Sequence, residues 1–220
     1  MPGATGLAPA LSFLQIPTTG NGAYVDDGVN RTEYTFSSVP VGAASANRFV
    51  VMVMGADNQG ASRSLTTAPT CNGSDMTIVR SSGGFSDGVR GTMAFIKLPT
   101  GTTAEFIATY DGTMGDCGIG IYAVTSSTGT MSVRDESLSL TGTLASVDAV
   151  KGDVIIGVDV ENGASGALMS WTGSSEAFAT VIDNDNIVSS YEAITGPVTR
   201  TQATSPTSGD HVSIMAAFKP

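Results

Sequence analysis

The chain contains 220 residues, of which 41% are hydrophobic and only 14% are charged. This composition supplies enough apolar side chains for a sizeable buried core and excludes a disordered tail. The net charge is −10 and the arginines are scattered singly, which argues against a nucleic-acid partner because phosphate binding needs clustered Lys and Arg. No apolar run approaches the roughly 20 residues of a membrane-spanning helix, so we expect no membrane partner.

Residues 1–30 contain Pro and Gly too often for a regular element. We predict an extended N-terminal arm over this segment, whose apolar side chains bind either the chain's own domain or a neighbouring subunit. The predicted partner-binding residues are Leu7, Leu11, Phe13, Leu14 and Ile16. The first basic residue is Arg31, so no charged region precedes the apolar patch and we expect no secretory signal peptide.

Beyond residue 30, apolar runs rich in Val, Ile, Thr and Phe recur between Gly, Asn, Asp and Pro, which predicts short β-strands separated by turns. No stretch shows helical periodicity with caps. The predicted strands of the first half lie at 32–36, 48–54, 64–68, 75–80, 91–98, 103–110 and 117–124. Those of the second half lie at 137–140, 153–160, 167–171, 176–182, 187–194, 198–203 and 211–218.

The two sets of strands resemble each other in sequence. VVMVMGADNQGAS at 50–62 corresponds to VIIGVDVENGAS at 154–165, since each is an apolar strand followed by an acidic residue, Asn and Gly-Ala-Ser. GDCGIGIYAV and GDHVSIMAAF are a second matching pair, and they place Asp116 and Asp210 in equivalent turns. Such self-similarity indicates an internal duplication.

We therefore predict an all-β protein, an antiparallel β-sandwich formed by residues 31–220 with an internal seven-strand repeat. The repeat units lie at about 32–124 and 136–218, the size of an immunoglobulin-like sandwich. The units form either one merged, jelly-roll-like sandwich or two tandem immunoglobulin-like sandwiches. The short connection at 125–135 favours the merged form.

The pattern Gly84-Phe85-Ser86-Asp87-Gly88 matches the G-x-S-x-G motif of serine hydrolases. That motif requires a strand, a strained turn and a following helix. Here another strand follows, and the only histidine, His211, begins a strand of the second repeat. We interpret the segment as a hairpin loop.

Asp183-Asn184-Asp185-Asn186 offers the alternating oxygen ligands of a calcium loop. It lacks the Gly at position six and the Glu at position twelve, where Ile194 stands. Asp and Asn also form turns through their own side chains, so a turn is the favoured interpretation and calcium the alternative.

Glycoside hydrolysis would need two carboxylates about 5 to 10 Å apart in a cleft. The candidates lie at strand ends or turns, and no spacing singles out a pair: Glu105, Asp111, Asp116, Asp159 and Glu161. Trp171 is a possible sugar-stacking platform, but a single tryptophan in a β-sandwich is more typical of the core. We predict no enzyme activity, no catalytic residues and no cofactor.

The two cysteines, Cys71 and Cys117, have no CxxC spacing. A metal site or redox pair is therefore not predicted. They either pair across neighbouring strands or remain buried free thiols.

The segments RFVVMVMG (48–55), LPTGTTAEFIATYDGTM (98–114) and CGIGIYAVTS (117–126) resemble all-β virion structural proteins of tailed phages. The resemblance implies a non-enzymatic particle component, and we expect a capsid decoration (cement) protein that binds and stabilises the shell. The expected partners are the major capsid protein or other virion proteins, with a homo-oligomer, a trimer, as the working form. The expected location is the virion, after synthesis in the host cytoplasm. The alternative is a tail or fibre subunit acting as a receptor- or glycan-binding module.

Overall fold

The computed structural model describes residues 10–15, 24–25, 29–57, 63–82, 88–140, 143–162, 170–182, 185–203 and 211–220. These residues form β-strands and connecting turns, with no helix among them. Every strand pair is antiparallel. The prediction of an all-β, antiparallel sandwich is confirmed.

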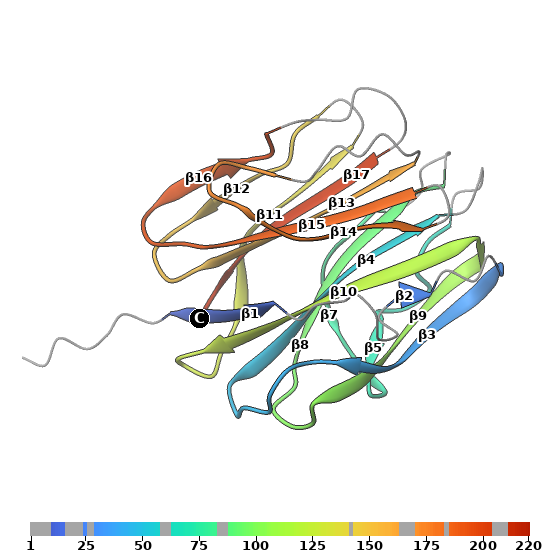
Figure 1. The fold of residues 1–220 in the computed structure, drawn as a ribbon, viewed down its shortest axis with the longest axis horizontal. Helices are drawn as coiled ribbons and strands as arrows, with labels where there is room; N and C mark the ends of the chain where they lie inside the picture. Colours follow the sequence, from blue (N-terminus) through green and yellow to red (C-terminus); the bar gives the residue numbers. More distant parts are fainter. Residues whose placement is uncertain are drawn as a thin grey trace, which may run out of the picture.

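Four sheets stack on one another (Figure 1). The first outer sheet contains, in order, β3 (Arg31–Pro40), β9 (Thr103–Met114), β5 (Thr70–Cys71) and β6 (Ser74–Asp75). The first inner sheet contains β1 (Leu11–Gln15), β10 (Asp116–Ser126), β4 (Arg48–Asp57), β8 (Arg90–Lys97) and β7 (Thr77–Ser81), with β2 (Tyr24–Val25) beside β10. The second inner sheet contains β11 (Ser132–Leu140), β17 (His211–Lys219), β13 (Val154–Asn162), β15 (Asp185–Ala193) and β14 (Ser175–Ile182). The second outer sheet contains β12 (Ser146–Ala149) and β16 (Val198–Thr201).

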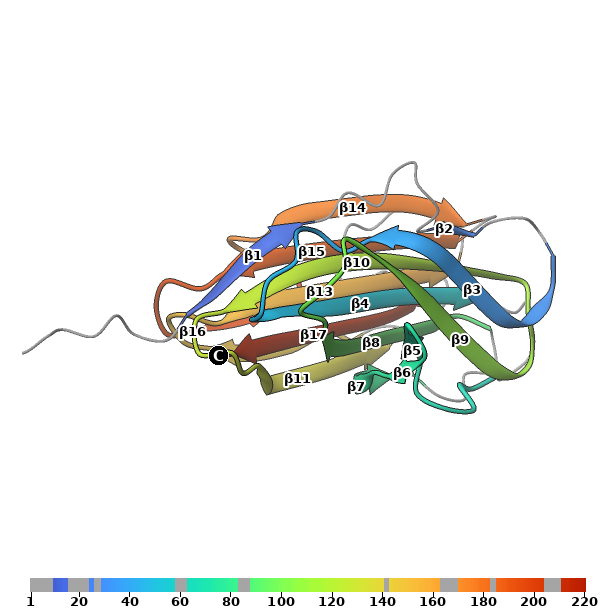
Figure 2. The same cartoon turned by 90° about the horizontal axis from the view of Figure 1, so that it is seen from below.

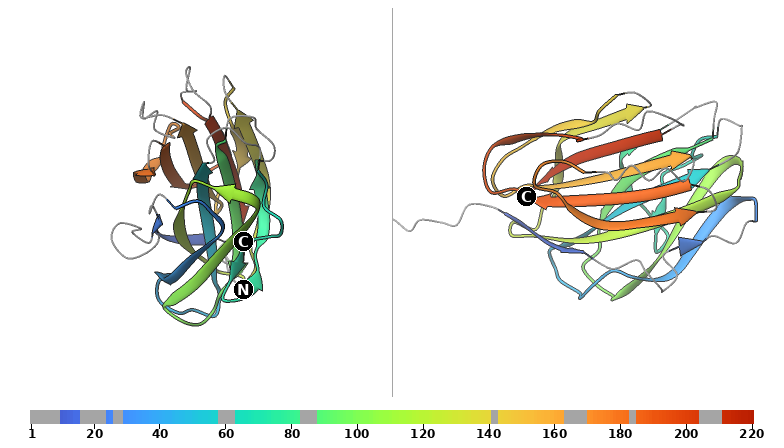
Figure 3. Two further views of the ribbon diagram at one scale, coloured as in Figure 1. Left: turned by 90° about the vertical axis from the view of Figure 1, so that its right-hand side faces the viewer. Right: turned by 45° about the horizontal axis from the view of Figure 1, so that its top comes forward.

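Three hydrophobic cores separate the four layers. The first, between the first outer and first inner sheets, includes Tyr34, Phe106 and Met52. The second lies between the two inner sheets, whose strands run along the long axis of the molecule (Figure 2). The third lies between the second inner sheet, seen face-on in Figure 3 (right), and the second outer sheet; it includes Val147 and Trp171.

The inner strands are buried on both faces, which explains their uninterrupted apolar sequences. All ten residues of β4 are buried, whereas β9 in the first outer sheet alternates between buried and exposed positions over much of its length. A sheet covered on both sides favours continuous apolar runs, and a sheet with one solvated face favours alternation.

The inner sheets share one pairing order. In the first, β10, β4, β8 and β7 are neighbours in that order, and in the second β17, β13, β15 and β14 follow the same order. The sheets face each other through β4 on β13, β8 on β17 and β7 on β11. Each half is thus a sandwich of an outer and an inner sheet, and the two sandwiches share the second core. The jelly-roll detail stays a prediction.

Close approach of the inner sheets requires glycine at two positions. A Cβ on Gly55 would lie 2.5 Å from Cδ1 of Ile187, and one on Gly91 would lie 2.9 Å from Cγ1 of Val212. A side chain at either position would require Ile187 or Val212 to shift within the second core, so the sequence of β4 and β8 is adapted to the contact between the halves.

Several segments differ between the prediction and the structure. Residues 64–68 contain only an isolated bridge at Leu65, not a strand. β12 was not predicted, because its four residues, SVDA, are too few and too polar to give a periodic signal. Of the predicted strand at 167–171, residues 170 and 171 are not in a strand, and 167–169 lie outside the described residues.

Candidate functional site

The predicted arm contributes a strand to the chain's own first inner sheet. Leu11 is 8% exposed within the second core, and its backbone N–H donates to the carbonyl of Gly152 at 2.9 Å. Phe13 and Leu14 lie in β1, opposite Val124 and Ala123 of β10. The edge of β10 supplies the backbone partners that a Pro- and Gly-rich segment cannot supply itself. Leu7 and Ile16 lie outside the described residues, and the role of the arm in binding a partner stays a prediction.

Two of the sequence motifs lie partly outside the described residues. Ser86 of the G-x-S-x-G pattern lies outside them, and so do Asp183 and Asn184 of the Asp-Asn run. Asp185 and Asn186 are the first residues of β15 rather than turn residues. Asn186 pairs in register with Glu161 of β13.

The structure separates the candidate carboxylates into three environments. Glu105 and Asp111 lie on the exposed side of β9, where Glu105 accepts a hydrogen bond from Ser37 at 3.1 Å. Asp116 is the buried first residue of β10, opposite Asp57. Asp210, its predicted equivalent, lies outside the described residues.

Asp159 and Glu161 belong to a buried group that we call the second polar end. It comprises Asp159, Glu161, Asn186, His211 and Ser213, and each is at most 9% exposed. Register places Glu161 between Asn186 and His211, and Asp159 beside Ser213. The Ser213 hydroxyl donates to Oδ1 of Asp159 at 2.9 Å. Sequence alone did not group these residues, because both faces of the inner strands are buried and alternation carries no signal.

Burial controls the protonation of the second polar end. Loss of solvent raises the pKa of Asp159 to about 7, partly offset by the Ser213 hydrogen bond and reinforced by Glu161. Burial lowers the pKa of His211, and the Glu161 charge partly offsets that effect. Arg134 and Arg200 form ion pairs elsewhere, with Asp153 and Glu192. The group can therefore hold a proton near neutral pH.

The first inner sheet has a corresponding polar end, which we call the first polar end: Asp57, Asp116 and Arg90. Arg90 is 2% exposed, and burial lowers the pKa of its guanidinium, while Tyr110, Asp111 and Asp57 act in the opposite direction. Its Nη1 donates to the carbonyl of Val89 at 2.8 Å.

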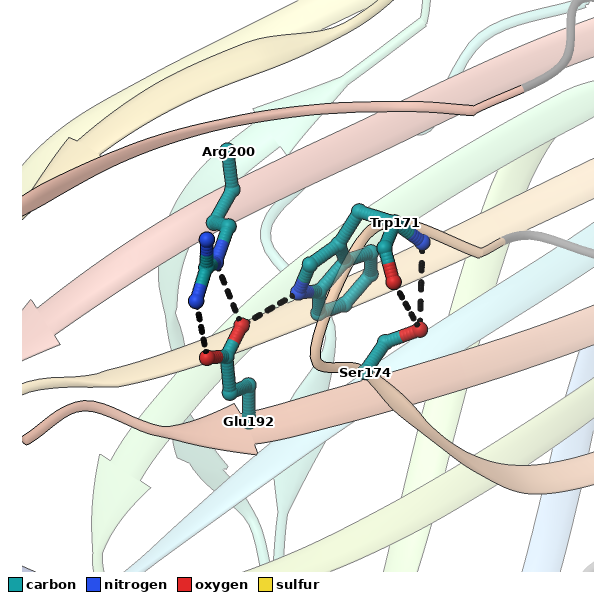
Figure 4. Close-up of polar contacts among 4 residues, drawn as sticks. All are labelled: Trp171, Ser174, Glu192 and Arg200. Atoms are coloured by element: carbon teal, nitrogen blue, oxygen red, sulfur yellow. Dashed lines mark hydrogen bonds and ion pairs between the residues drawn. The ribbon is translucent and has the colours of Figure 1, made fainter.

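A separate polar group surrounds Trp171, between the second inner and second outer sheets (Figure 4). The indole Nε1–H donates to Oε2 of Glu192 at 2.8 Å. Arg200 donates to the same carboxylate from Nε at 2.8 Å and from Nη2 at 2.6 Å. Trp171 is 4% exposed, so its ring belongs to the third core and is not a stacking platform.

A pocket of about 200 Å³ opens beside this ion pair, lined by residues that include Glu192, Ile194, Thr195, Gly196, Pro197 and Arg200. Sequence analysis missed Glu192 and Arg200, because no local motif relates them to Trp171. Gly173 is required beside them, since its φ is +95° and a Cβ would lie 2.8 Å from Oε1 of Glu192.

The cysteines are buried free thiols, which decides the alternative that their sequence left open. Burial raises the pKa of Cys71 to about 11 and that of Cys117 to about 12. Neither is a reactive thiolate at neutral pH.

The described residues include no group of three or more His, Cys, Asp or Glu side chains placed to hold a metal ion. Within the same ranges no helix is long and apolar enough to cross a membrane.

Comparison with protein-family models, curated proteins and solved structures gave no match for this chain. The fold, the two polar ends and the pocket beside Glu192 and Arg200 are therefore interpreted from their own chemistry.

Proposed function

We propose that the protein is a non-enzymatic structural component of a tailed-phage particle, a capsid decoration protein that binds the shell and stabilises it. Of the three segments that carry the sequence resemblance, two lie within β4 and β10, and the third contains β9. All three strands contribute to the first core. The resemblance therefore concerns a packed structural unit rather than a site.

The observation that carries the proposal is the continuous four-layer stack. Because the inner sheets bury both faces, the two halves cannot separate without exposing the second core. Decoration proteins stabilise a shell by burying area across its joints, and this requires a body that keeps its shape under load. Exposed positions on β3 and β9 form a polar outer face suited to solvent or to a wet contact.

Copy number in purified particles tests the proposal. We expect hundreds of copies per particle by quantitative mass spectrometry against the major capsid protein. A handful of copies would place the protein at the tail, and none would contradict a particle role altogether.

We also expect a symmetric homo-oligomer, a trimer, by light scattering of the purified protein.

The arm needs a test that spares β1. Removing residues 1–9 leaves Leu11 and the pairing of β1 with β10 in place. If the arm binds a neighbouring subunit, this deletion lowers shell occupancy while thermal stability of the free protein is unchanged. Unchanged occupancy would contradict binding of the arm to a neighbouring subunit. A deletion of 1–22 also removes β1 and lowers stability, so it serves as the comparison.

A tail or fibre module that binds a receptor or glycan is the second candidate. The pocket beside Glu192 and Arg200 favours it, because concave sites with a few fixed polar groups are typical of small-ligand binding.

A further inference from the structure

The pocket beside the second outer sheet presents a polar pair that is already fixed in position. Arg200 contacts both carboxylate oxygens of Glu192, and the Trp171 indole holds the same carboxylate from the core side (Figure 4). The side chains of Glu192 and Arg200 are only 12% and 22% exposed. Groups held in this way lose little further conformational freedom when a ligand binds.

The pair keeps unused hydrogen-bonding capacity on both sides. A guanidinium has five N–H donors, and Arg200 gives two of them to Glu192. Oε1 of Glu192 accepts only one of these bonds and has a further lone pair available. Donors and an acceptor therefore lie side by side at the pocket.

The chemistry of the pair selects a neutral hydroxyl compound over an anion. A hydroxyl both donates and accepts, so neighbouring hydroxyls satisfy Arg200 and Glu192 together. A carboxylate only accepts; it would face the like charge of Glu192, on a chain whose net charge is −10. Ile194 and Pro197 add apolar surface for the C–H face of a ring.

We propose that this pocket binds a single neutral pyranose unit of a glycan, with Arg200 donating to and Glu192 accepting from adjacent hydroxyls. Trp171 positions Glu192 and does not stack on the sugar. The inference does not depend on whether the protein is on the shell or the tail, and it is tested on the isolated protein.

Trp171 supplies a specific reporter, because it is the only tryptophan in the chain. Its indole N–H gives one signal in a ¹H–¹⁵N spectrum. The probes are the methyl α-glycosides of glucose, galactose and mannose, N-acetylglucosamine, and acetate as the anion. We expect at least one neutral sugar to shift the signal saturably, with a Kd on the order of 1 to 10 mM for so small a contact. No shift with any sugar, or a shift with acetate alone, would overturn the proposal.

Gly196→Phe blocks the pocket without touching the ion pair. Its φ lies outside the left-handed region, and no atom lies within 4 Å of a Cβ built there. We expect the variant to keep a single, sharp indole signal, at a position set by the new ring, and to lose the sugar response. Thr102→Phe, at an exposed position outside the pocket, is the matched control and should respond as wild type. A sugar response that persists in Gly196→Phe would contradict this location.

Discussion

The two polar ends of the inner sheets contain buried acids at corresponding places, and they differ in the basic residue that belongs to each: Arg90 in the first and His211 in the second. Asp57 in β4 corresponds by pairing order to Glu161 in β13. The first polar end includes the Arg90 guanidinium. The second polar end includes His211, which lies opposite Glu161. An arginine keeps its charge at neutral pH, whereas a histidine loses it near neutral pH. The positive charge contributed by Arg90 is therefore permanent, and that contributed by His211 depends on pH.

The largest effect is expected from removing the permanent cation. Arg90→Met leaves the carboxylate of Asp57 buried without the nearby guanidinium charge, and it also removes the hydrogen bonds to the carbonyls of Arg63 and Val89. We expect a loss of about 3 to 5 kcal/mol in the free energy of unfolding at pH 7. Urea denaturation measures it.

Arg80→Met is the control for that change, because Arg80 pairs with Glu136 at a site where 48% of its side chain is exposed. A surface pair of this kind contributes less than about 1 kcal/mol. Equal losses in the two variants would show that the first polar end does not depend on its arginine.

The second largest effect is a gain in stability from Asp159→Asn at alkaline pH. The folded protein holds the Asp159 proton up to about pH 7, whereas the unfolded chain releases it near the ordinary value of 3.8. The contribution of Asp159 to the free energy of unfolding is therefore largest below pH 3.8, and it declines as the pH rises toward 7. The variant should gain on the order of 2 to 4 kcal/mol at pH 8 and nothing at pH 3.5.

Asp75→Asn, an exposed position in β6, is the matched control and should be neutral at both pH values. Urea midpoints for the wild type and both variants at the two pH values make the comparison. A loss of stability in Asp159→Asn at pH 8 would mean that the ionised carboxylate is needed.

Ser213→Ala should have a smaller, pH-dependent effect. The hydroxyl donates to Oδ1 of Asp159 and stabilises the ionised form more than the protonated one. We expect a loss of about 1 to 2 kcal/mol at pH 8 and less at pH 5. A ¹³C titration of the Asp159 carboxyl should show its pKa rising further; a fall would contradict the assigned role of the hydrogen bond.

The smallest effect is expected for His211→Gln. Burial lowers the pKa of His211, so the unfolded chain binds a proton more readily, and wild-type stability declines as pH falls below about 6.5. The variant should lack this decline and differ little at pH 8. Because His211 is the only histidine, its imidazole signal gives the titration directly. A midpoint above 6.5 would contradict the expected direction.

The inner strands were predictable from sequence and the layers were not. The predicted strands at 48–54 and 211–218 lie within β4 and β17, because a run buried on both faces is apolar throughout. The same feature hides which side chains face which neighbour. The sequence match of Asp116 with Asp210 is an example. Asp116 lies opposite Asp57, and His211 lies opposite the corresponding residue Glu161. The pairing register therefore makes His211, one residue further along, the equivalent of Asp116.

The candidate sites were predictable only in part. Asp159 and Glu161 stood out as carboxylates, but their burial beside His211 depends on strand register. Glu192 and Arg200 belong to β15 and β16, which follow each other in the chain but lie in different sheets. Their contact with each other and with Trp171 depends on tertiary packing. Short strands such as β12 follow from the same packing rather than from local propensity.

The most direct test of a structural role on a particle is to add the purified protein back to shells that lack it. We expect saturable binding at hundreds of copies per shell and a higher temperature of shell rupture in the presence of the protein. Shells that bind none of it, or whose rupture temperature is unchanged at full occupancy, would contradict the proposed decoration function.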